Sequence, residues 1–264
     1  MARTLLDHPL LSSRYFFPRR GSLHDAFLVT TADGSAQLAC YRAAPHADAL
    51  TVLHFHGNAE IVSDYVPEVA EVVTSFGVNV VFAEYRGYGA STGSPSLGAM
   101  IDDAEVVFQA VGLPAERIVA FGRSLGSLFA VEVVARHPDA AGLVIESGIA
   151  DPLEATIARV SAEDLGTSPH ALAAEVAARF DQRAKLAAYR GPILVLHTAQ
   201  DMLIPASHAE RLASWGGAPA TEKKLVIFPQ GDHGTIYPAN RAAYIAELGS
   251  FLGRLRVPGA NRRG

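Results

Sequence analysis

The sequence is poor in cysteine, since Cys40 is the single one among 264 residues. No disulfide can therefore form within the chain, a reducing compartment is allowed, and no metal site can be built from cysteines alone. Basic residues are not in excess either: 22 Lys and Arg stand against 27 Asp and Glu, which gives a formal net charge of -5. Because phosphate binding needs a basic surface, this balance argues against nucleic acid as the main partner.

Long apolar runs are also missing. No window offers the ~18 apolar residues that a membrane-spanning helix needs. The first twenty residues contain Asp7, Pro9, Pro18 and two adjacent arginines, and no apolar segment precedes a small-residue cleavage site. We therefore expect no signal peptide, no stable membrane anchor and a cytoplasmic location. The aromatic residues 15–17 are interpreted as packing anchors.

The hydrophobic residues that are present make up 49% of the chain, which is enough for a large core and excludes a disordered protein. Apolar runs typical of strands occur at residues 26–31, 36–42, 50–55, 78–83, 117–121, 142–146, 192–197 and 224–228. Helix-like patterns lie between them, at 60–75, 99–111, up to about 136, 206–215 and 239–253. This alternation predicts an α/β fold with a mostly parallel sheet covered by helices on both faces. The Asp33-Gly34 pair predicts an antiparallel hairpin at one edge.

We expect a single domain over residues 1–264. One stretch, residues 152–190, breaks the alternation because it is Ala-rich, helical in pattern and without a strand signal. An insertion between two strands on the ligand side of the sheet predicts a small helical lid. An ordinary long helical crossover explains the same pattern.

The segment Gly122-Arg123-Ser124-Leu125-Gly126 lies between an expected strand and an expected helix. In this context the G-x-S-x-G pattern is typical of a nucleophile elbow, in which the serine hydroxyl is presented above the sheet. The glycines leave room for strand and helix to approach each other. The backbone amide of Leu125, at the helix start, points to where an oxyanion forms. Ser124 is thus the candidate nucleophile.

Three further polar positions follow expected strands, where ligands of open α/β sheets bind. Asp201 follows the strand at 192–197, and by itself indicates only a turn or helix-capping carboxylate. His233 lies in a Gly-rich loop after the strand at 224–228. Asn58 follows the strand at 50–55, and its amide, or that of Ala59, could supply a second oxyanion donor.

The order Ser124, Asp201, His233 along the chain is the nucleophile–acid–base order of α/β-hydrolases. From about residue 27 to 253 the chain resembles this superfamily, and more narrowly the short-lid serine hydrolases that include the depalmitoylating α/β-hydrolase-domain proteins and their bacterial relatives. The segments that carry the resemblance are His56-Gly57-Asn58-Ala59, Glu84-Tyr85-Arg86-Gly87-Tyr88-Gly89-Ala90-Ser91-Thr92-Gly93, Gly122-Arg123-Ser124-Leu125-Gly126, Phe180-Asp181, Asp201-Met202-Leu203-Ile204-Pro205 and Gly231-Asp232-His233.

The resemblance implies the α/β-hydrolase fold, with an eight-stranded sheet and a small helical lid. It implies that Ser124 is the nucleophile, His233 the base and Asp201 the residue that orients it, with oxyanion amides from Leu125 and Asn58. Asp232 and Glu146 are alternative acids. The expected reaction is hydrolysis of a small-molecule ester or thioester through an acyl-enzyme, which needs neither metal nor organic cofactor.

Two other functions compete with this interpretation. A peptidase or acyltransferase would use the same fold and residues, and a non-catalytic ligand-binding protein would keep only the scaffold. The sequence predicts neither the natural substrate nor the oligomeric state.

Overall fold

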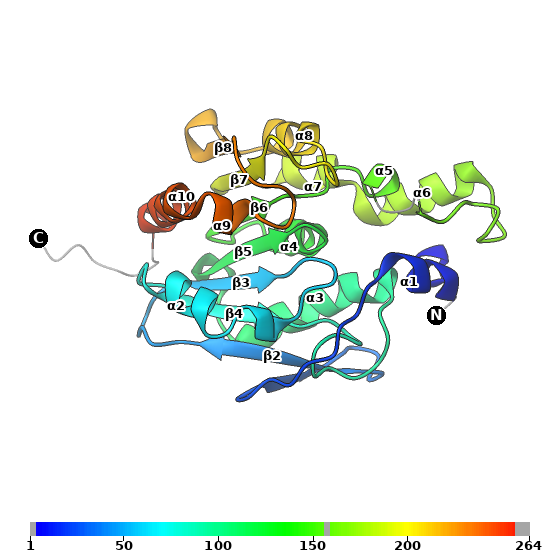
Figure 1. The fold of residues 1–264 in the computed structure, drawn as a ribbon, viewed down its shortest axis with the longest axis horizontal. Coiled ribbons are helices and arrows are strands. Elements are labelled where there is room, and N and C mark those ends of the chain that lie inside the picture. Colours follow the sequence, from blue (N-terminus) through cyan, green and yellow to red (C-terminus); the bar gives the residue numbers. More distant parts are fainter. Residues whose placement is uncertain (1–3, 156–158, 257–264) are drawn as a thin grey trace, which may run out of the picture.

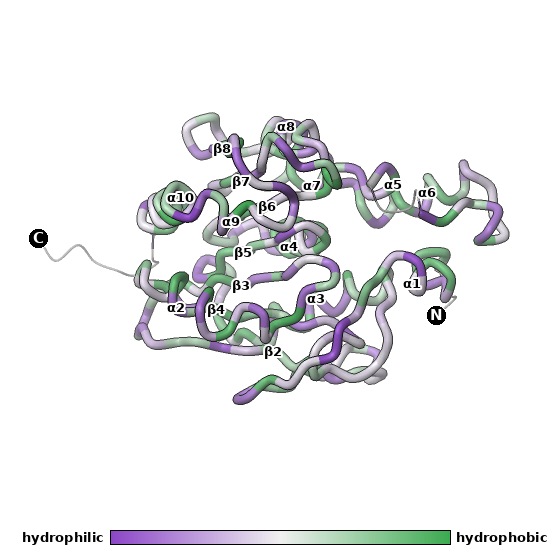
Figure 2. The backbone as a smooth tube through the Cα atoms, viewed as in Figure 1, coloured by the Kyte–Doolittle hydropathy of each residue, from purple (hydrophilic) through white to green (hydrophobic). Residues whose placement is uncertain are grey.

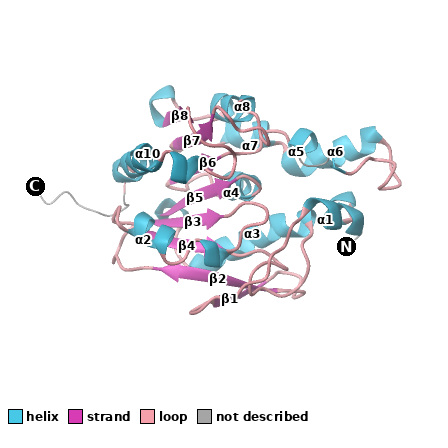
Figure 3. Cartoon of the chain, in the orientation of Figure 1, coloured by secondary structure: helices cyan, strands magenta, loops and turns pink. Residues whose placement is uncertain are grey.

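The computed structural model describes residues 4–155 and 159–256, which form a sheet flanked by helices (Figures 1 and 3). The strands are β1 (Phe27–Thr30), β2 (Gln37–Ala43), β3 (Thr51–Phe55), β4 (Asn79–Ala83), β5 (Ile118–Arg123), β6 (Gly142–Glu146), β7 (Ile193–Thr198) and β8 (Lys223–Phe228). The helices are α1 (Pro9–Tyr15), α2 (Glu68–Thr74), α3 (Leu97–Val111), α4 (Gly126–Arg136), α5 (Pro152–Ala155), α6 (Pro169–Phe180), α7 (Gln182–Ala188), α8 (Ser207–Trp215), α9 (Ile236–Ala239) and α10 (Arg241–Arg254).

The eight strands follow the spatial order β1-β2-β4-β3-β5-β6-β7-β8. The pairs β1–β2 and β2–β4 are antiparallel, and all pairs from β4 to β8 are parallel. The predicted fold class is therefore confirmed, including the antiparallel hairpin at one edge. Parallel strands aligned in this way bring the loops after β3, β5, β7 and β8 to the same edge of the sheet.

The central strands are buried on both faces, and every residue of β3 to β7 is buried. Leu53, Ala120 and Ile145 belong to a core shared with α3, α4 and α8, whereas their neighbours Val52 and Val144 belong to a second core with α2 and α10. This is the period-2 alternation of strand side chains between two helical layers. Figure 2 shows hydrophobic residues along the central strands.

The helix predicted over residues 60–75 is wrong in extent. The structure has only a short 3-10 turn at Val62–Asp64 and then α2, which begins at Glu68. Pro67 precedes α2 and has no backbone N–H, so a continuous helix through this position would lose a hydrogen bond and clash with the preceding turn. The apolar spacing continues through Pro67, but the helix cannot.

The region predicted as a lid contains α5, α6 and α7, and no strand occurs within its described residues. Among all described residues, no helix is both long and apolar enough to cross a membrane. Of the three N-terminal aromatic residues, Tyr15 and Phe16 are buried as expected, but Phe17 is 48% exposed. Its ring lies 5.3 Å from the guanidinium of Arg159, so it is a surface residue and not a core anchor.

Candidate active site

The turn between β5 and α4 has the geometry of a nucleophile elbow. Ser124 has a left-handed backbone, with φ of +50°, which L-residues adopt only under constraint. A Cβ on Gly122 would lie 2.4 Å from the carbonyl oxygen of Gly126, and a Cβ on Gly126 would lie 2.1 Å from the carbonyl oxygen of Phe55. Glycine is required at both positions because the backbones of strand, turn and helix approach so closely.

Ser124, His233 and Asp201 form one chain of hydrogen bonds. His233 Nδ1 lies 2.7 Å from Asp201 Oδ2, and His233 Nε2 lies 2.8 Å from Ser124 Oγ. Since a carboxylate only accepts, Nδ1 carries the proton and Nε2 is free to accept the serine O–H. The structure thus brings together three residues from the loops after β5, β7 and β8 that the sequence separates by up to 109 positions.

Asp201 is held by its own backbone neighbours as well as by the imidazole. Its Oδ1 accepts the N–H groups of Leu203 at 2.9 Å and Ile204 at 2.8 Å. Burial by itself would raise the pKa of this carboxyl, but the hydrogen bonds from His233 and Ile204 and the nearby histidine charges outweigh burial, so the pKa is lowered. Asp201 is therefore ionised near neutral pH and oriented toward His233.

Neither alternative acid contacts the His233 side chain. Asp232 is exposed and accepts hydrogen bonds from the Thr235 hydroxyl and the Gly234 amide. Glu146 is buried, accepts a hydrogen bond from the Tyr244 hydroxyl, and pairs with Arg123 Nε at 3.0 Å. The geometry therefore favours Asp201 as the partner of the imidazole.

Two backbone amides beside Ser124 are available to a ligand. Within residues 4–155 and 159–256, no hydrogen bond is made by the N–H of Leu125 or the N–H of Asn58. The N–H of Ala59, the alternative second donor, instead donates to Asn58 Oδ1 at 3.0 Å. Of the two candidates left open by the sequence, this contact favours Asn58. Among the same residues, no group of three His, Cys, Asp or Glu side chains is placed to hold a metal ion.

Comparison with known proteins agrees with this architecture. A family model described as serine aminopeptidase, S33, matches residues 46–173. The uncharacterized protein YfhR of Escherichia coli K12 is 30% identical over 187 residues, which cover 69% of this chain and 62% of YfhR. The α/β hydrolase domain-containing protein WAV2 of Arabidopsis thaliana is 29% identical over 202 residues, which cover 72% of this chain and 65% of WAV2.

The chain belongs to the α/β-hydrolase superfamily. Solved structures share its fold at low identity. A Pyrococcus furiosus esterase aligns with a TM-score of 0.72 and 18% identity over 91% of this chain and 99% of its own. A Paleococcus ferrophilus monoacylglycerol lipase aligns with a TM-score of 0.63 and 17% identity over 81% and 98%. This α/β-hydrolase spans less than two thirds of the length of YfhR and WAV2.

In this α/β-hydrolase the loop after β3 is held from several sides. The Asn58 side chain accepts hydrogen bonds from the Tyr88 hydroxyl at 2.7 Å and the Phe17 N–H at 3.0 Å, and donates to the Tyr15 carbonyl at 2.7 Å. The Tyr85 hydroxyl donates to the carbonyl of His56 at 2.6 Å. The hydroxyls of Tyr85 and Tyr88 and the backbone of Tyr15 and Phe17 thus fix the position of this loop.

His56 shapes this loop as a buried cation. Its Nδ1 faces the Gly57 carbonyl at 2.8 Å and its Nε2 faces Glu84 Oε1 at 2.7 Å. Because both neighbours are acceptors, both ring nitrogens carry protons. Burial by itself would lower the pKa of His56, but the charge of Glu84 and its hydrogen bond prevail, so the pKa is raised above the ordinary 6.5.

The His56–Glu84 pair predicts a pH-dependent stability. A raised folded-state pKa gives stabilisation that is complete below 6.5 and is lost as the pH rises through the folded-state value. We expect the free energy of unfolding, measured in urea, to fall as the pH rises across this window in wild type. In His56→Gln this fall is expected to disappear, and an unchanged pH slope in the variant would show that another group is responsible.

The close packing around Gly126, the second glycine of the elbow, leads to a second prediction. In Gly126→Ala the added Cβ meets the backbone of the β3 loop, so we expect a loss of about 1–3 kcal/mol in the free energy of unfolding. Gly253 in α10 is the matched control, because an added Cβ there meets no atom within 4 Å. In Gly253→Ala we expect the free energy of unfolding to be unchanged or slightly raised. An equal change in the free energy of unfolding in the two variants would contradict the close approach of Gly126 to the end of β3.

Some residues near the site were not predicted. His197 on β7 is buried beside Asp201 and donates through Nε2 to the Ile204 carbonyl at 2.9 Å, which supports the turn that carries the carboxylate. The hydroxyl of Ser91 accepts the N–H of Ala39 on β2 at 2.9 Å, which ties the segment after β4 to the sheet. Arg86 pairs with the carboxylate of Asp103 through two hydrogen bonds of 2.6 Å. The sequence did offer a signal for His197, which stands inside an apolar strand segment. A polar side chain buried in this way needs a hydrogen-bond partner.

Proposed function

We propose that this protein is a serine hydrolase that cleaves carboxylic esters or thioesters. The observation that carries the proposal is the continuous hydrogen-bonded chain from Ser124 Oγ through the His233 imidazole to the buried Asp201 carboxylate. The esterase and the monoacylglycerol lipase that share the fold agree with this reaction class. No metal or organic cofactor enters the mechanism.

In the first half-reaction the Ser124 oxygen attacks the substrate carbonyl carbon while His233 Nε2 takes the hydroxyl proton. The carbonyl electron pair moves onto oxygen, and the N–H groups of Leu125 and Asn58 stabilise that oxyanion. Losing one such donor typically costs about 3–4 kcal/mol of barrier. The tetrahedral species collapses when the bond to the leaving alcohol or thiol breaks and His233 returns its proton to the leaving group.

In the second half-reaction water takes the place of the serine. His233 accepts a proton from the water that attacks the acyl-enzyme, and it then protonates Ser124 as the carboxylic acid leaves. Asp201 keeps the imidazole in the correct tautomer and stabilises the imidazolium that forms twice in each cycle. Every proton taken is thus returned within the cycle.

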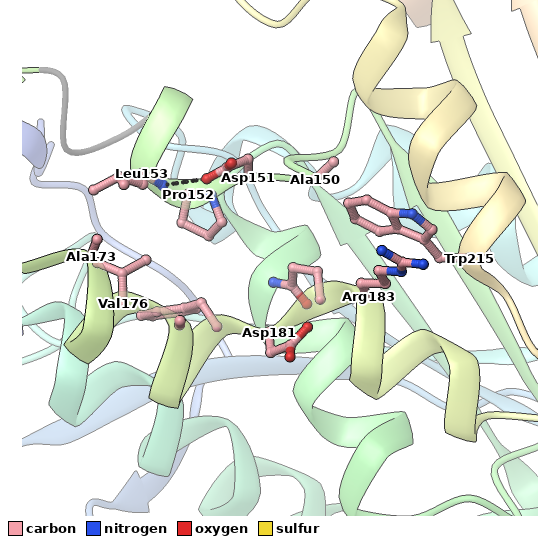
Figure 4. Close-up of a pocket in the computed structure, with 12 residues that line it drawn as sticks. Ala150, Asp151, Pro152, Leu153, Ala173, Val176, Asp181, Arg183 and Trp215 are labelled. Carbon is pink, nitrogen blue, oxygen red and sulfur yellow. Dashed lines mark hydrogen bonds between the residues drawn. The ribbon is translucent and has the colours of Figure 1, made fainter. Parts of the chain in front are cut away.

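The lid predicted within residues 152–190 is also a proposal, and we place it on α5 and α6. The adjoining α7 is tied to the scaffold, since Lys185 pairs with Glu132 of α4 at 2.6 Å and the Tyr189 hydroxyl donates to the Ala140 carbonyl at 2.8 Å. Helices α5 and α6 border a pocket of about 360 Å³ whose wall also includes Gln182 and Arg183 of α7 and Trp215 of α8 (Figure 4). The α6 side of the segment contacts the N-terminus through a hydrogen bond from the Leu6 N–H to Glu175.

A substrate panel tests the proposed function. Nitrophenyl esters, acyl thioesters and aminoacyl amides of rising acyl-chain length are assayed with wild type and Ser124→Ala. Turnover of the esters or thioesters by wild type alone would support the proposal. Turnover restricted to the amides would favour a peptidase, and equal rates for both proteins across the panel would contradict a serine hydrolase.

A further inference from the structure

Arg123, the residue before the candidate nucleophile, lies at the centre of a buried ionic network. It ends β5 and is only 8% exposed. Its guanidinium pairs with Glu60 and, through Nε, with Glu146 at 3.0 Å. A third contact reaches the base: Arg123 Nη2 donates to the backbone carbonyl of His233 at 2.8 Å.

The contact with Glu60 extends to the loop that carries the Asn58 amide. Glu60 Oε2 accepts the N–H of Gly57 at 2.7 Å and the hydroxyl of Tyr65 at 2.6 Å. A Cβ on Gly57 would lie 2.6 Å from Arg123 Nη1, so the loop passes directly over the guanidinium. The position of this loop therefore depends on Arg123 both through an ion pair and through close packing.

The contact with Glu146 extends to the nucleophile. Arg123 and Glu146 are register partners on the adjacent strands β5 and β6. The backbone carbonyl of Glu146 accepts the N–H of Ser124 at 2.8 Å, and its carboxylate also accepts the Tyr244 hydroxyl of α10. One side chain thus contacts elements that hold the nucleophile, the base and one oxyanion amide.

We propose that Arg123 is a positioning residue that sets the His233 loop and the Gly57–Asn58 loop relative to Ser124. The inference rests on the proposed function, because it assigns Arg123 a role in the same reaction. An arginine suits this role since its planar group carries five donors in a fixed fork and can serve three acceptors at once. A lysine keeps the charge but concentrates it on one ammonium group, and so cannot hold all three acceptors in the same geometry.

The test uses Arg123→Lys in the 264-residue chain, with Arg86→Lys as the matched control. Arg86 is likewise buried, at 6% exposure, and likewise paired with a buried carboxylate, that of Asp103, but it makes no contact with His233. We expect kcat of Arg123→Lys to fall about 100-fold, since small misplacements of reacting groups cost that much. KM is expected to stay within about threefold, because ground-state binding is not removed.

A spectroscopic readout separates positioning from general loss of structure. The downfield proton resonance of the His233–Asp201 hydrogen bond should shift or broaden in Arg123→Lys and stay unchanged in Arg86→Lys. Arg123→Lys with wild-type kcat and an unchanged resonance would overturn the proposal. Loss of kcat to the same extent in both lysine variants, in step with their melting temperatures, would overturn it too.

A second variant guards against misfolding. Arg123→Met combined with Glu60→Gln and Glu146→Gln removes the buried cation together with both of its anionic partners, so no unpaired charge is left behind. It is expected to fold and still to show the loss of kcat, whereas recovery of wild-type kcat would refute the positioning role. If wild type hydrolyses no ester or thioester, the proposed function fails, but the resonance still tests whether Arg123 positions His233.

Discussion

Ser124→Ala is expected to lower kcat of the esterase reaction by about 10⁴- to 10⁶-fold, because the remaining oxyanion donors and binding contacts give only residual catalysis without a nucleophile. Labelling by a fluorophosphonate probe should disappear. The fold should persist, since among the residues that the structure describes the Ser124 hydroxyl bonds only to His233, and the left-handed backbone is imposed by its neighbours. Ester turnover, probe labelling and thermal unfolding measure the three effects.

Ser147 offers a matched control for this experiment. It also directly follows a strand of the sheet, has a left-handed backbone with φ of +47°, and is fully buried. Its hydroxyl has no hydrogen-bond partner among the described residues. Ser147→Ala should therefore label and turn over like wild type. Labelling that persists in Ser124→Ala would refute the assignment of the nucleophile.

Asp201→Asn is expected to lower kcat by about 10⁴-fold through the tautomer of His233. The Asn Oδ1 can still accept the N–H groups of Leu203 and Ile204, so its amide N–H₂ turns toward Nδ1 of the imidazole. The histidine proton then moves to Nε2, which can no longer accept the proton of Ser124. KM should change little because substrate contacts remain.

A variant of the neighbouring Asp232 is the control for loss of a negative charge near His233 without loss of its hydrogen bond. Its carboxylate is exposed and bonds to Thr235 and Gly234, so Asp232→Asn should change kcat by less than about threefold. Steady-state kinetics of the two asparagine variants, run side by side, provide the comparison. A larger loss in Asp232→Asn than in Asp201→Asn would mean that the hydrogen bond between Asp201 and His233 does not govern the reaction.

Local patterns were sufficient for the fold because each central strand is a short apolar run that can only be stable inside a two-sided sheet. The strands at 142–146 and 192–197 were located within one residue of β6 and β7. The pattern failed where the hydrophobic spacing ran through Pro67, since periodicity does not register a missing backbone donor. It also failed at Phe17, whose exposure depends on contacts with Asn58 and Arg159, which are remote in sequence.

The order of polar residues after the strands, together with the resemblance to α/β-hydrolases, pointed to Ser124, Asp201, His233, Leu125 and Asn58. The loops after parallel strands converge at one edge of the sheet wherever the chain returns, so these residues were expected to lie together. Tertiary structure alone decided that Asp201 and not Glu146 meets the imidazole, and that Asn58 and not Ala59 keeps a free amide. It also revealed the contacts of Arg123. Hydrogen bonds act over about 3 Å, and distances of that size between residues a hundred positions apart are set by packing, which no local pattern records.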